Sequence, residues 1–250
     1  MPTKKSAAKK PVKKKRPVKR RNHLDPTPKI LIFDVDGVLV DVRETFWLSA
    51  LQTVRELTGK RATMAELHKW KSKPGNNDDW NMIANWVTAL GHPISYEEAR
   101  AAFQKFYWGT DGKPGNVVKE KLLLTGKQLE KWASRFEINL FTGRTRKEYA
   151  YTFDKWPHSK YFRMVVTMDD VTRKKPAPDG VLKILGNRDP KSALYLGDNI
   201  DDALSAKAAG VRFMGILGSK DPDYRARAVR FRKLDALALL PRITDLNKWL

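Results

Sequence analysis

The sequence predicts an α/β fold in which a doubly wound parallel sheet carries a small all-helical domain inserted after the first strand. Two observations predict it. Short apolar runs alternate with helical patterns along most of the chain, which is typical of strand–helix–strand units in a parallel sheet covered on both faces. Residues 42–135, directly after the first apolar run, show helical patterns only. This stretch therefore interrupts the alternation as an insertion.

Five apolar runs are the expected strands, each short enough for a strand that is buried on both faces. They are residues 30–33, 138–141, 164–166, 193–196 and 211–216. The helices expected between the later strands are residues 145–155, 178–185 and 200–209, the last closed by Gly210. In such a sheet, the ligand site lies at the carboxyl ends of the strands.

Capping signals divide the inserted segment into helices. Three positions have a Ser, Thr or Asp followed three residues later by Glu: Asp41–Glu44, Thr63–Glu66 and Ser95–Glu98. Asp78 or Asp79 is expected to begin a further helix that Gly91 ends, and residues 73–77 before it form a loop.

The positive charge of the chain is concentrated at its N-terminus. The net charge is +21, and residues 1–22 hold eleven Lys or Arg and no acidic residue. This segment has too little apolar surface to offset the entropy cost of ordering, so we expect a disordered basic arm over residues 1–26. Solubility, non-specific polyanion contact through residues 1–25, and specific nucleic-acid binding or targeting are all open roles for it.

The remaining composition limits the class of protein. Apolar residues make up 41% of the chain, enough for a buried core, but no apolar run approaches the length of roughly 18–20 residues that spans a bilayer. The N-terminus lacks the apolar segment of a secretory signal, so we expect a cytoplasmic protein without membrane contact. The absence of cysteine excludes disulfides and thiolate metal sites. No metal-ligand spacing joins the histidines, and His68 and His92 are expected at the surface or at helix ends.

The strongest chemical signal is Asp34-Val35-Asp36-Gly37 at the end of the first expected strand. Residues two apart on a strand point the same way, and glycine permits a sharp turn. Buried carboxylates this close repel unless a cation or proton lies between them. Oxygen ligands favour Mg²⁺, so the pattern predicts a magnesium site, the alternative being acids that end a strand in solvent.

The second acidic signal is Gly197-Asp198-Asn199, which follows an expected strand and opens a helix. Asp198 would lie beside Asp34 if the two strands are neighbours, and Asp202 would lie one helical turn further on. The alternative is that Asp198 or Asp201 caps the helix.

Two further segments could bind phosphate. Thr142 and Gly143 follow an expected strand and precede a helix, where a hydroxyl and backbone N–H groups can hold an anion. The prolines after Lys175 keep this lysine outside the next helix, where it could neutralise phosphate and carboxylates together. Taken singly, these segments also fit an ordinary strand-to-helix turn and a solvated lysine.

In their order and context, these motifs resemble those of the haloacid-dehalogenase (HAD) superfamily, over roughly residues 29–220. The motifs are Asp34-x-Asp36-Gly37, Thr142, Lys175-Pro176 and Gly197-Asp198-x-x-x-Asp202. There are 108 positions from Asp34 to Thr142 but only 33 from Thr142 to Lys175, so the insertion follows the first motif. This is similar to the helical C1-cap branch, subfamily IA, which includes phosphoglycolate phosphatases and β-phosphoglucomutases. The resemblance implies a Rossmann-like core over residues 27–41 and 121–250 and a cap domain over residues 42–120.

The resemblance also implies a role for each motif residue. Asp34 would be the nucleophile that forms an aspartyl-phosphate, and Asp36 the general acid and base. Dehalogenases lack an acid at the second position, so Asp36 indicates phosphoryl transfer. The resemblance assigns phosphoryl binding to Thr142, Gly143 and Lys175, Mg²⁺ binding to Asp34, Asp36 and Asp198, and a supporting position behind them to Asn199 and Asp202.

The cap is expected to select the substrate, since the core sees only the phosphate. The candidates for contact with the leaving group are Lys71, Lys73, Asn76 and Asn77 in the cap and Arg144 beside the phosphate turn. Polar cap loops are also commonly solvated, and Arg144 would equally fit an ion pair. Within the branch, residues 73–80 and 106–109 are similar to an uncharacterised phosphatase-like subfamily that sometimes accompanies histidine-biosynthesis functions.

The sequence therefore predicts a Mg²⁺-dependent phosphatase that hydrolyses a small phosphorylated metabolite. A phosphomutase of the β-phosphoglucomutase type shares every core motif and differs in whether the cap admits water or a second sugar phosphate. A nucleotide or polynucleotide phosphatase that uses the basic arm is the alternative from another functional class.

Overall fold

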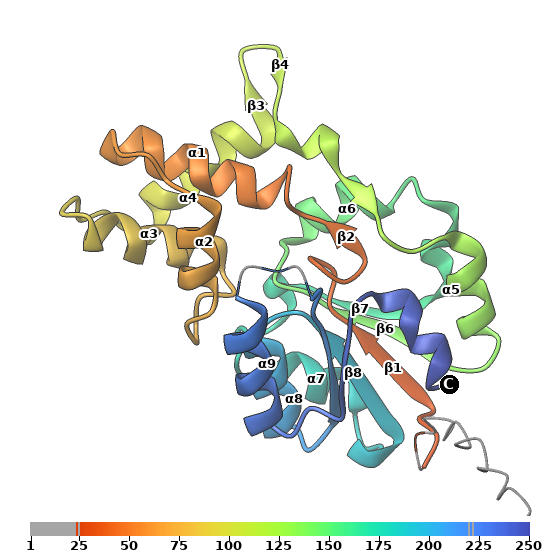
Figure 1. The fold of residues 1–250 in the computed structure, drawn as a ribbon. Coiled ribbons are helices and arrows are strands. Elements are labelled where there is room, and N and C mark those ends of the chain that lie inside the picture. The colour runs from red at the N-terminus through yellow and green to blue at the C-terminus, as the bar shows by residue number, and fades with distance from the viewer. Residues whose placement is uncertain (1–23, 25, 220, 222) are drawn as a thin grey trace, which may run out of the picture.

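The structure is a computed structural model that describes residues 24, 26–219, 221 and 223–250. At its centre is a six-stranded parallel sheet in the order β10-β9-β8-β1-β6-β7 (Figure 1). The strands are β1 (Ile30–Phe33), β6 (Glu137–Phe141), β7 (Phe162–Val166), β8 (Ala193–Gly197), β9 (Arg212–Ile216) and β10 (Ala238–Leu240). The five expected strands are confirmed. The sequence does not predict β10, which is only three residues long and half-buried in part.

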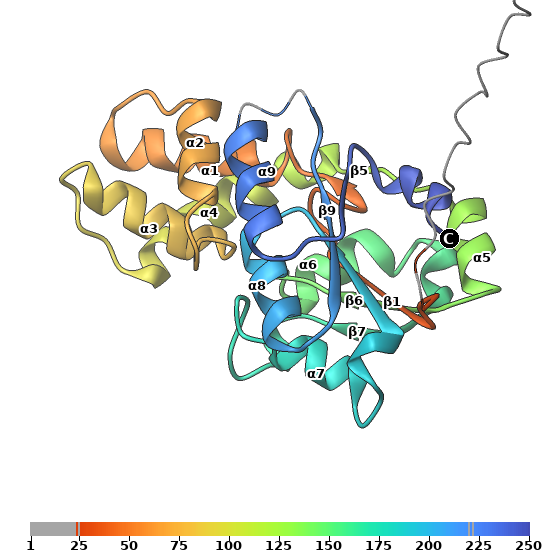
Figure 2. The ribbon, with the colours of Figure 1, turned by 60° about the horizontal axis from the view of Figure 1, so that its bottom comes forward.

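Both faces of the sheet are buried, because the side chains of each strand alternate between two hydrophobic clusters. In β1, Leu31 and Phe33 join one cluster and Ile30 and Ile32 the other. The first cluster is covered by α5 (Gly126–Ala133), α6 (Arg146–Phe153) and the 3₁₀ helix η5 (Ile243–Lys248). The second is covered by α7 (Asp179–Leu185), α8 (Ile200–Ala208) and α9 (Tyr224–Lys233) (Figure 2). The doubly wound α/β fold is thereby confirmed.

The strand order brings the predicted motifs to one edge of the sheet. Strand β1 pairs with β6 on one side and β8 on the other, so the chain reverses its direction of winding between β7 and β8. Phe33 is aligned with Leu140 of β6 and Leu196 of β8. The residues that follow these three strands therefore lie side by side at a topological switch point, where ligands bind in such sheets.

The inserted segment, residues 42–120, forms a separate layer above this edge (Figure 1), and we call it the cap. Its helices are α1 (Phe46–Thr58), α2 (Met64–Lys71), α3 (Asp79–Ala89) and α4 (Tyr96–Trp108). They bury a third hydrophobic cluster, to which the core contributes Met168. Two-residue strands pair as β2 (Val40–Asp41) with β5 (Lys121–Leu122) and β3 (Gly109–Thr110) with β4 (Lys113–Pro114). The expectation of helix only over residues 42–135 is therefore wrong at β3, β4 and β5.

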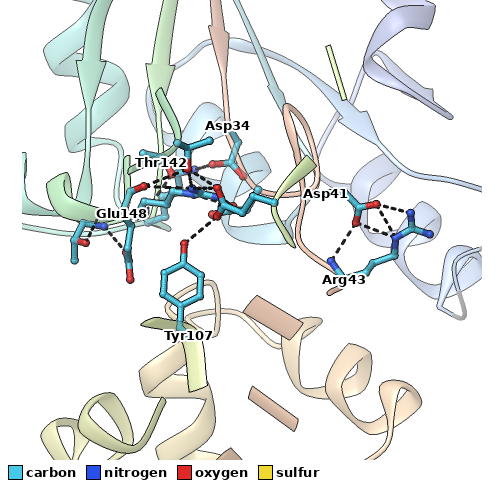
Figure 3. Close-up of polar contacts among 12 residues, drawn as sticks. Asp34, Asp41, Arg43, Tyr107, Thr142 and Glu148 are labelled. Atoms are coloured by element: carbon cyan, nitrogen blue, oxygen red, sulfur yellow. Dashed lines mark hydrogen bonds and ion pairs between the residues drawn. The ribbon is translucent and has the colours of Figure 1, made fainter. Parts of the chain in front are cut away.

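Two of the three predicted capping boxes are confirmed, at Thr63–Glu66 and Ser95–Glu98. Asp78 caps α3, and residues 73–77 form the expected loop. The third box is wrong, because α1 begins at Phe46 rather than after Asp41. The Asp41 carboxylate instead accepts hydrogen bonds from the backbone and guanidinium of Arg43 (Figure 3).

Most of the expected basic arm, residues 1–23 and 25, lies outside the described residues. Its last part does not fit the expectation. Leu24 is 7% exposed and packs in the first hydrophobic cluster, and the Pro26 carbonyl accepts a hydrogen bond of 2.6 Å from Arg212. Burial of a large aliphatic side chain outweighs the ordering cost at this point. Within the described part of the chain, no helix is both long and apolar enough to cross a bilayer.

Candidate active site

Asp34, the first residue after β1, is bound by a buried lysine. Lys175 Nζ donates to Asp34 Oδ1 at 2.8 Å and to Asp202 Oδ1 of α8 at 2.7 Å. All three side chains are at most 3% exposed. Burial raises the pKa of Asp34 well above its usual range, although the Lys175 ammonium opposes this shift. One lysine thus joins two carboxylates from separate elements and does not fully compensate their charge.

Three carboxylates converge at this edge of the sheet. Asp34, Asp198 and Asp202 can each place an oxygen within 4.8 Å of the other two. Burial raises the pKa of Asp198 to about 7; Arg227 opposes this shift and Asp202 adds to it. A nearby cation stabilises the ionised form of such buried carboxylates. A set of oxygen donors alone suits a hard divalent ion. The residues present therefore fit a divalent metal.

Asp36, expected in this metal set, has a different partner. The buried Arg144 guanidinium donates to Asp36 Oδ1 through Nε at 3.0 Å and Nη2 at 2.7 Å. Arg144 also pairs with Glu120 Oε1 at 2.9 Å, and Tyr107 of the cap helix α4 donates to the same oxygen at 2.9 Å (Figure 3). The Arg144 side chain is 0% exposed, so it is committed to these acids and is not placed to contact a substrate.

The turn after β6 lies beside Asp34, because β6 pairs with β1. Thr142 is fully buried, and its hydroxyl accepts the backbone N–H of Arg144 at 3.1 Å. A small cavity is lined by Thr142, Gly143 and Lys175 from the core and by Asn77 from the cap. The three residues expected to hold the phosphoryl group thus share one cavity.

A second cavity, of about 60 Å³, lies between the core and the cap. Its core side carries the acidic residues Asp34, Asp36 and Asp198. Its cap side includes the residues Trp47, His68, Lys71, Asn77 and Asp79. Lys71 Nζ is paired with Asp79 Oδ1 at 2.7 Å, so the cap contributes both signs of charge. His68 lies in the last turn of α2, as expected for a helix end, but is buried against Trp47.

The other two cap candidates do not line this cavity. Lys73 Nζ lies 3.3 Å from the centre of the Trp70 ring, and Asn76 Nδ2 donates to the Trp70 carbonyl at 3.0 Å. Both side chains therefore stabilise the cap loop itself.

The start of α8 resolves the capping alternative. Asn199 is the N-cap residue and forms a reciprocal capping box with Asp202, so neither Asp198 nor Asp201 caps the helix. Arg227 of α9, whose Nη2 lies 3.7 Å from Asp198 Oδ2, also lines the cavity. No sequence signal marks Arg227, because it is one of several arginines in a helix without a motif.

Comparisons with known proteins agree with this geometry. The sequence model of the family described as haloacid dehalogenase-like hydrolase matches residues 31–216. The chain is 27% identical over 192 residues to a phosphoglycolate phosphatase of Pseudomonas fluorescens, and the aligned region covers 76% of this chain and 69% of that protein. It is 25% identical over 197 residues to an imidazoleglycerol-phosphate dehydratase of Phytophthora nicotianae, covering 75% of this chain and 43% of that one.

A crystal structure of a predicted phosphoglycolate phosphatase from Haemophilus somnus has a TM-score of 0.68 and 18% identity, over 88% of this chain and 97% of that chain. At this identity, the comparison shows the fold alone. The family match covers strands β1 to β9 of the sheet and the inserted cap, and the motif residues meet at one edge of the sheet. The chain is therefore an enzyme that belongs to the haloacid dehalogenase-like hydrolase family, as its sequence predicts.

Proposed function

We propose that this enzyme is a Mg²⁺-dependent phosphatase that hydrolyses a small phosphomonoester through an aspartyl-phosphate on Asp34. The observation that carries the proposal is the environment of the Asp34 carboxylate, which is bound to Lys175 and lies in the group of Asp198 and Asp202. The phosphoglycolate phosphatases among its relatives support the same reaction class.

Asp34 attacks the phosphorus atom in this proposal. Lys175 is bonded to Asp34 Oδ1, so Oδ2 is the oxygen proposed to form the new P–O bond. Lys175 and the turn of Thr142 and Gly143 hold the other phosphoryl oxygens and neutralise their charge. In a buried site, fixed donors of this kind need no reorganisation as the reaction proceeds.

Asp36 carries the proton. Arg144 fixes this side chain through Oδ1, and both hydrogen bonds use that one oxygen. Oδ2 is then the proposed proton carrier, which protonates the leaving alkoxide and later accepts a proton from the water that hydrolyses the aspartyl-phosphate. One residue can serve both steps, because the second reverses the proton flow of the first.

Asp34 and Asp198 are the proposed side-chain ligands of the metal, as the sequence predicts. Asp202 completes the carboxylate group but is also bound to Lys175, and Asp36 is paired with Arg144. We therefore do not retain the Asp36 carboxylate as a ligand. When bound, the cation supplies positive charge that lowers the repulsion between a carboxylate nucleophile and a phosphate.

The test is Asp34→Asn, assayed with a panel of small phosphomonoesters in Mg²⁺. We expect kcat to fall below about a hundredth of the wild-type value with an unchanged circular dichroism spectrum, because an amide does not attack phosphorus. Asp189→Asn, at an exposed position outside the site, is the matched control and should retain activity. Normal turnover by Asp34→Asn would exclude the assignment.

Removal of the metal is a separate test. EDTA should abolish turnover, Mg²⁺ should restore it, and Ca²⁺ should restore it poorly, since its looser coordination misplaces the oxygens. Full activity after exhaustive chelation would contradict the metal requirement. Transfer of the phosphoryl group to a second sugar phosphate rather than to water would replace hydrolysis by the phosphomutase reaction.

A further inference from the structure

Asp201, in the first turn of α8, is a buried core carboxylate whose hydrogen bonds come from the cap. Its side chain is fully buried, and it caps neither end of its helix. The Gly75 N–H donates to both of its oxygens at 3.0 Å, and the Asn77 N–H donates to Oδ2 at 3.1 Å. No other hydrogen bond to this carboxylate is found among the described residues. A buried carboxylate needs hydrogen-bond donors to replace its lost hydration. Here the donors belong to the cap, so the contact forms only when the cap lies on the core.

The loop that Asp201 binds also reaches the phosphate turn. Asn77 lines both cavities of the site. A Cβ atom built on Gly143 would lie 2.9 Å from Asn77 Nδ2, so a side chain at this position would displace the amide from its place against the turn. The backbone of Asn77 is thus bound to Asp201, while its side chain lies against the turn proposed to hold the phosphoryl group.

A second contact holds the other end of the same loop. Asp78, which caps α3 through Oδ1, accepts hydrogen bonds at Oδ2 from Lys174 Nζ at 2.8 Å and from Tyr96 Oη at 2.9 Å. Lys174 precedes the proposed phosphate ligand Lys175, just as Asp201 precedes the lysine's partner Asp202. In both contacts, the core residue therefore directly precedes a residue of the proposed phosphate site in the sequence.

We propose that Asp201 is a positioning residue, which fixes cap residues 75–77 on the core and so places the Asn77 amide as a further hydrogen-bond donor at the phosphoryl site. Asn77 would donate through Nδ2 to a phosphoryl or leaving-group oxygen. Its effect on rate depends on the fixed orientation that Asp201 supplies. The catalytic part of this inference rests on the proposed phosphatase function, whereas the contact itself does not.

Amide hydrogen exchange tests the contact in the full-length protein. In Asp201→Ala, exchange at Gly75 and Asn77 should accelerate by about tenfold or more, because these N–H groups lose a charged acceptor. Asp201→Asn, which keeps one acceptor oxygen and nearly the same volume, should give a smaller acceleration. Ser205→Ala, on the same helix, is the control and should leave the loop unchanged, because the Ser205 hydroxyl donates to the core carbonyl of Ala177. Unchanged exchange in both Asp201 variants would overturn the proposal.

A double-mutant cycle tests whether Asp201 acts through Asn77. We expect Asp201→Ala and Asn77→Ala each to lower kcat/KM for a small phosphomonoester by about ten- to a hundredfold. The double variant should be no worse than the poorer single variant, because both changes remove one interaction. Additive losses would overturn the placement of Asn77, even if the exchange result holds. If the wild-type enzyme hydrolyses no phosphomonoester, the proposed function fails while the exchange experiment still decides the contact.

Discussion

Gly37 lies so close to Asp198 that a Cβ atom on this glycine would be 2.3 Å from Asp198 Oδ2. Gly37 also has a φ of +74°, in the left-handed region that other residues rarely adopt. The glycine that follows the first acidic motif therefore does more than permit a turn. It allows the loop after β1 to approach the carboxylate after β8, which the proposed metal site requires.

We expect Gly37→Ala to displace Asp198 and lower kcat by about a hundredfold, since shifts of about 1 Å at a reacting centre have effects of this size. The required Mg²⁺ concentration should rise as well. Gly59→Ala is the matched control: Gly59 has a φ of +67° and nothing within 4 Å of a built Cβ. It should cost about 1–2 kcal/mol of stability from backbone strain, with normal kcat. Equal kinetic losses in both variants would show that backbone strain alone is responsible.

Lys175 should stabilise the fold as well as the reaction. In Lys175→Met, the buried Asp34 and Asp202 lose their shared cation, and we expect the free energy of unfolding to fall by about 3 kcal/mol, measured with urea in EDTA. Asp202→Asn should recover part of this loss in the double variant, because one uncompensated carboxylate is removed. A Lys175→Met protein as stable as the wild type would contradict the ion-pair arrangement.

Asp36→Asn should separate substrates by their leaving groups. An alkoxide needs a proton to leave, whereas p-nitrophenolate leaves with little help. We therefore expect kcat to fall at least about tenfold more for an alkyl phosphate than for p-nitrophenyl phosphate. Arg144→Met, which removes the partner of Asp36 Oδ1, should show the same selectivity in weaker form. Equal losses for both substrates would remove the general-acid role.

The basic N-terminal segment should not contribute to turnover. Deleting residues 1–22 should leave kcat on a small phosphomonoester unchanged, because every proposed site residue lies at position 34 or beyond. If this segment contacts polyanions, the same deletion should weaken the dependence of the DNA-binding constant on salt concentration, because fewer counterions are released on binding. The measurement is the slope of log K for DNA binding against log salt concentration. Deletion to residue 25 is the comparison: it also removes Leu24 and should lower the free energy of unfolding by about 1–2 kcal/mol. Loss of turnover in the shorter deletion would contradict this prediction.

The sequence by itself determined five of the six strands, the inserted cap and the residues at the ends of those strands. Asp34, Thr142 and Asp198 each follow an apolar run, and the separation of these motifs in the sequence is enough to place them on different strands. These features are local, because a strand and the polar residue that follows it can be recognised within a few positions of the sequence.

The tertiary structure decided which of these residues contact one another. Arg144 binds Asp36 across 108 positions, and Gly75 binds Asp201 across 126. Neither pair has a local signal, because the first joins the loops after two separate core strands and the second joins the cap to the core. The same reason explains the start of α1: Asp41 has the sequence of a helix cap, but pairing of its strand with β5 and its bond to Arg43 outweigh that local preference. Local sequence offers each polar side chain several partners of similar energy, and packing of distant segments selects among them.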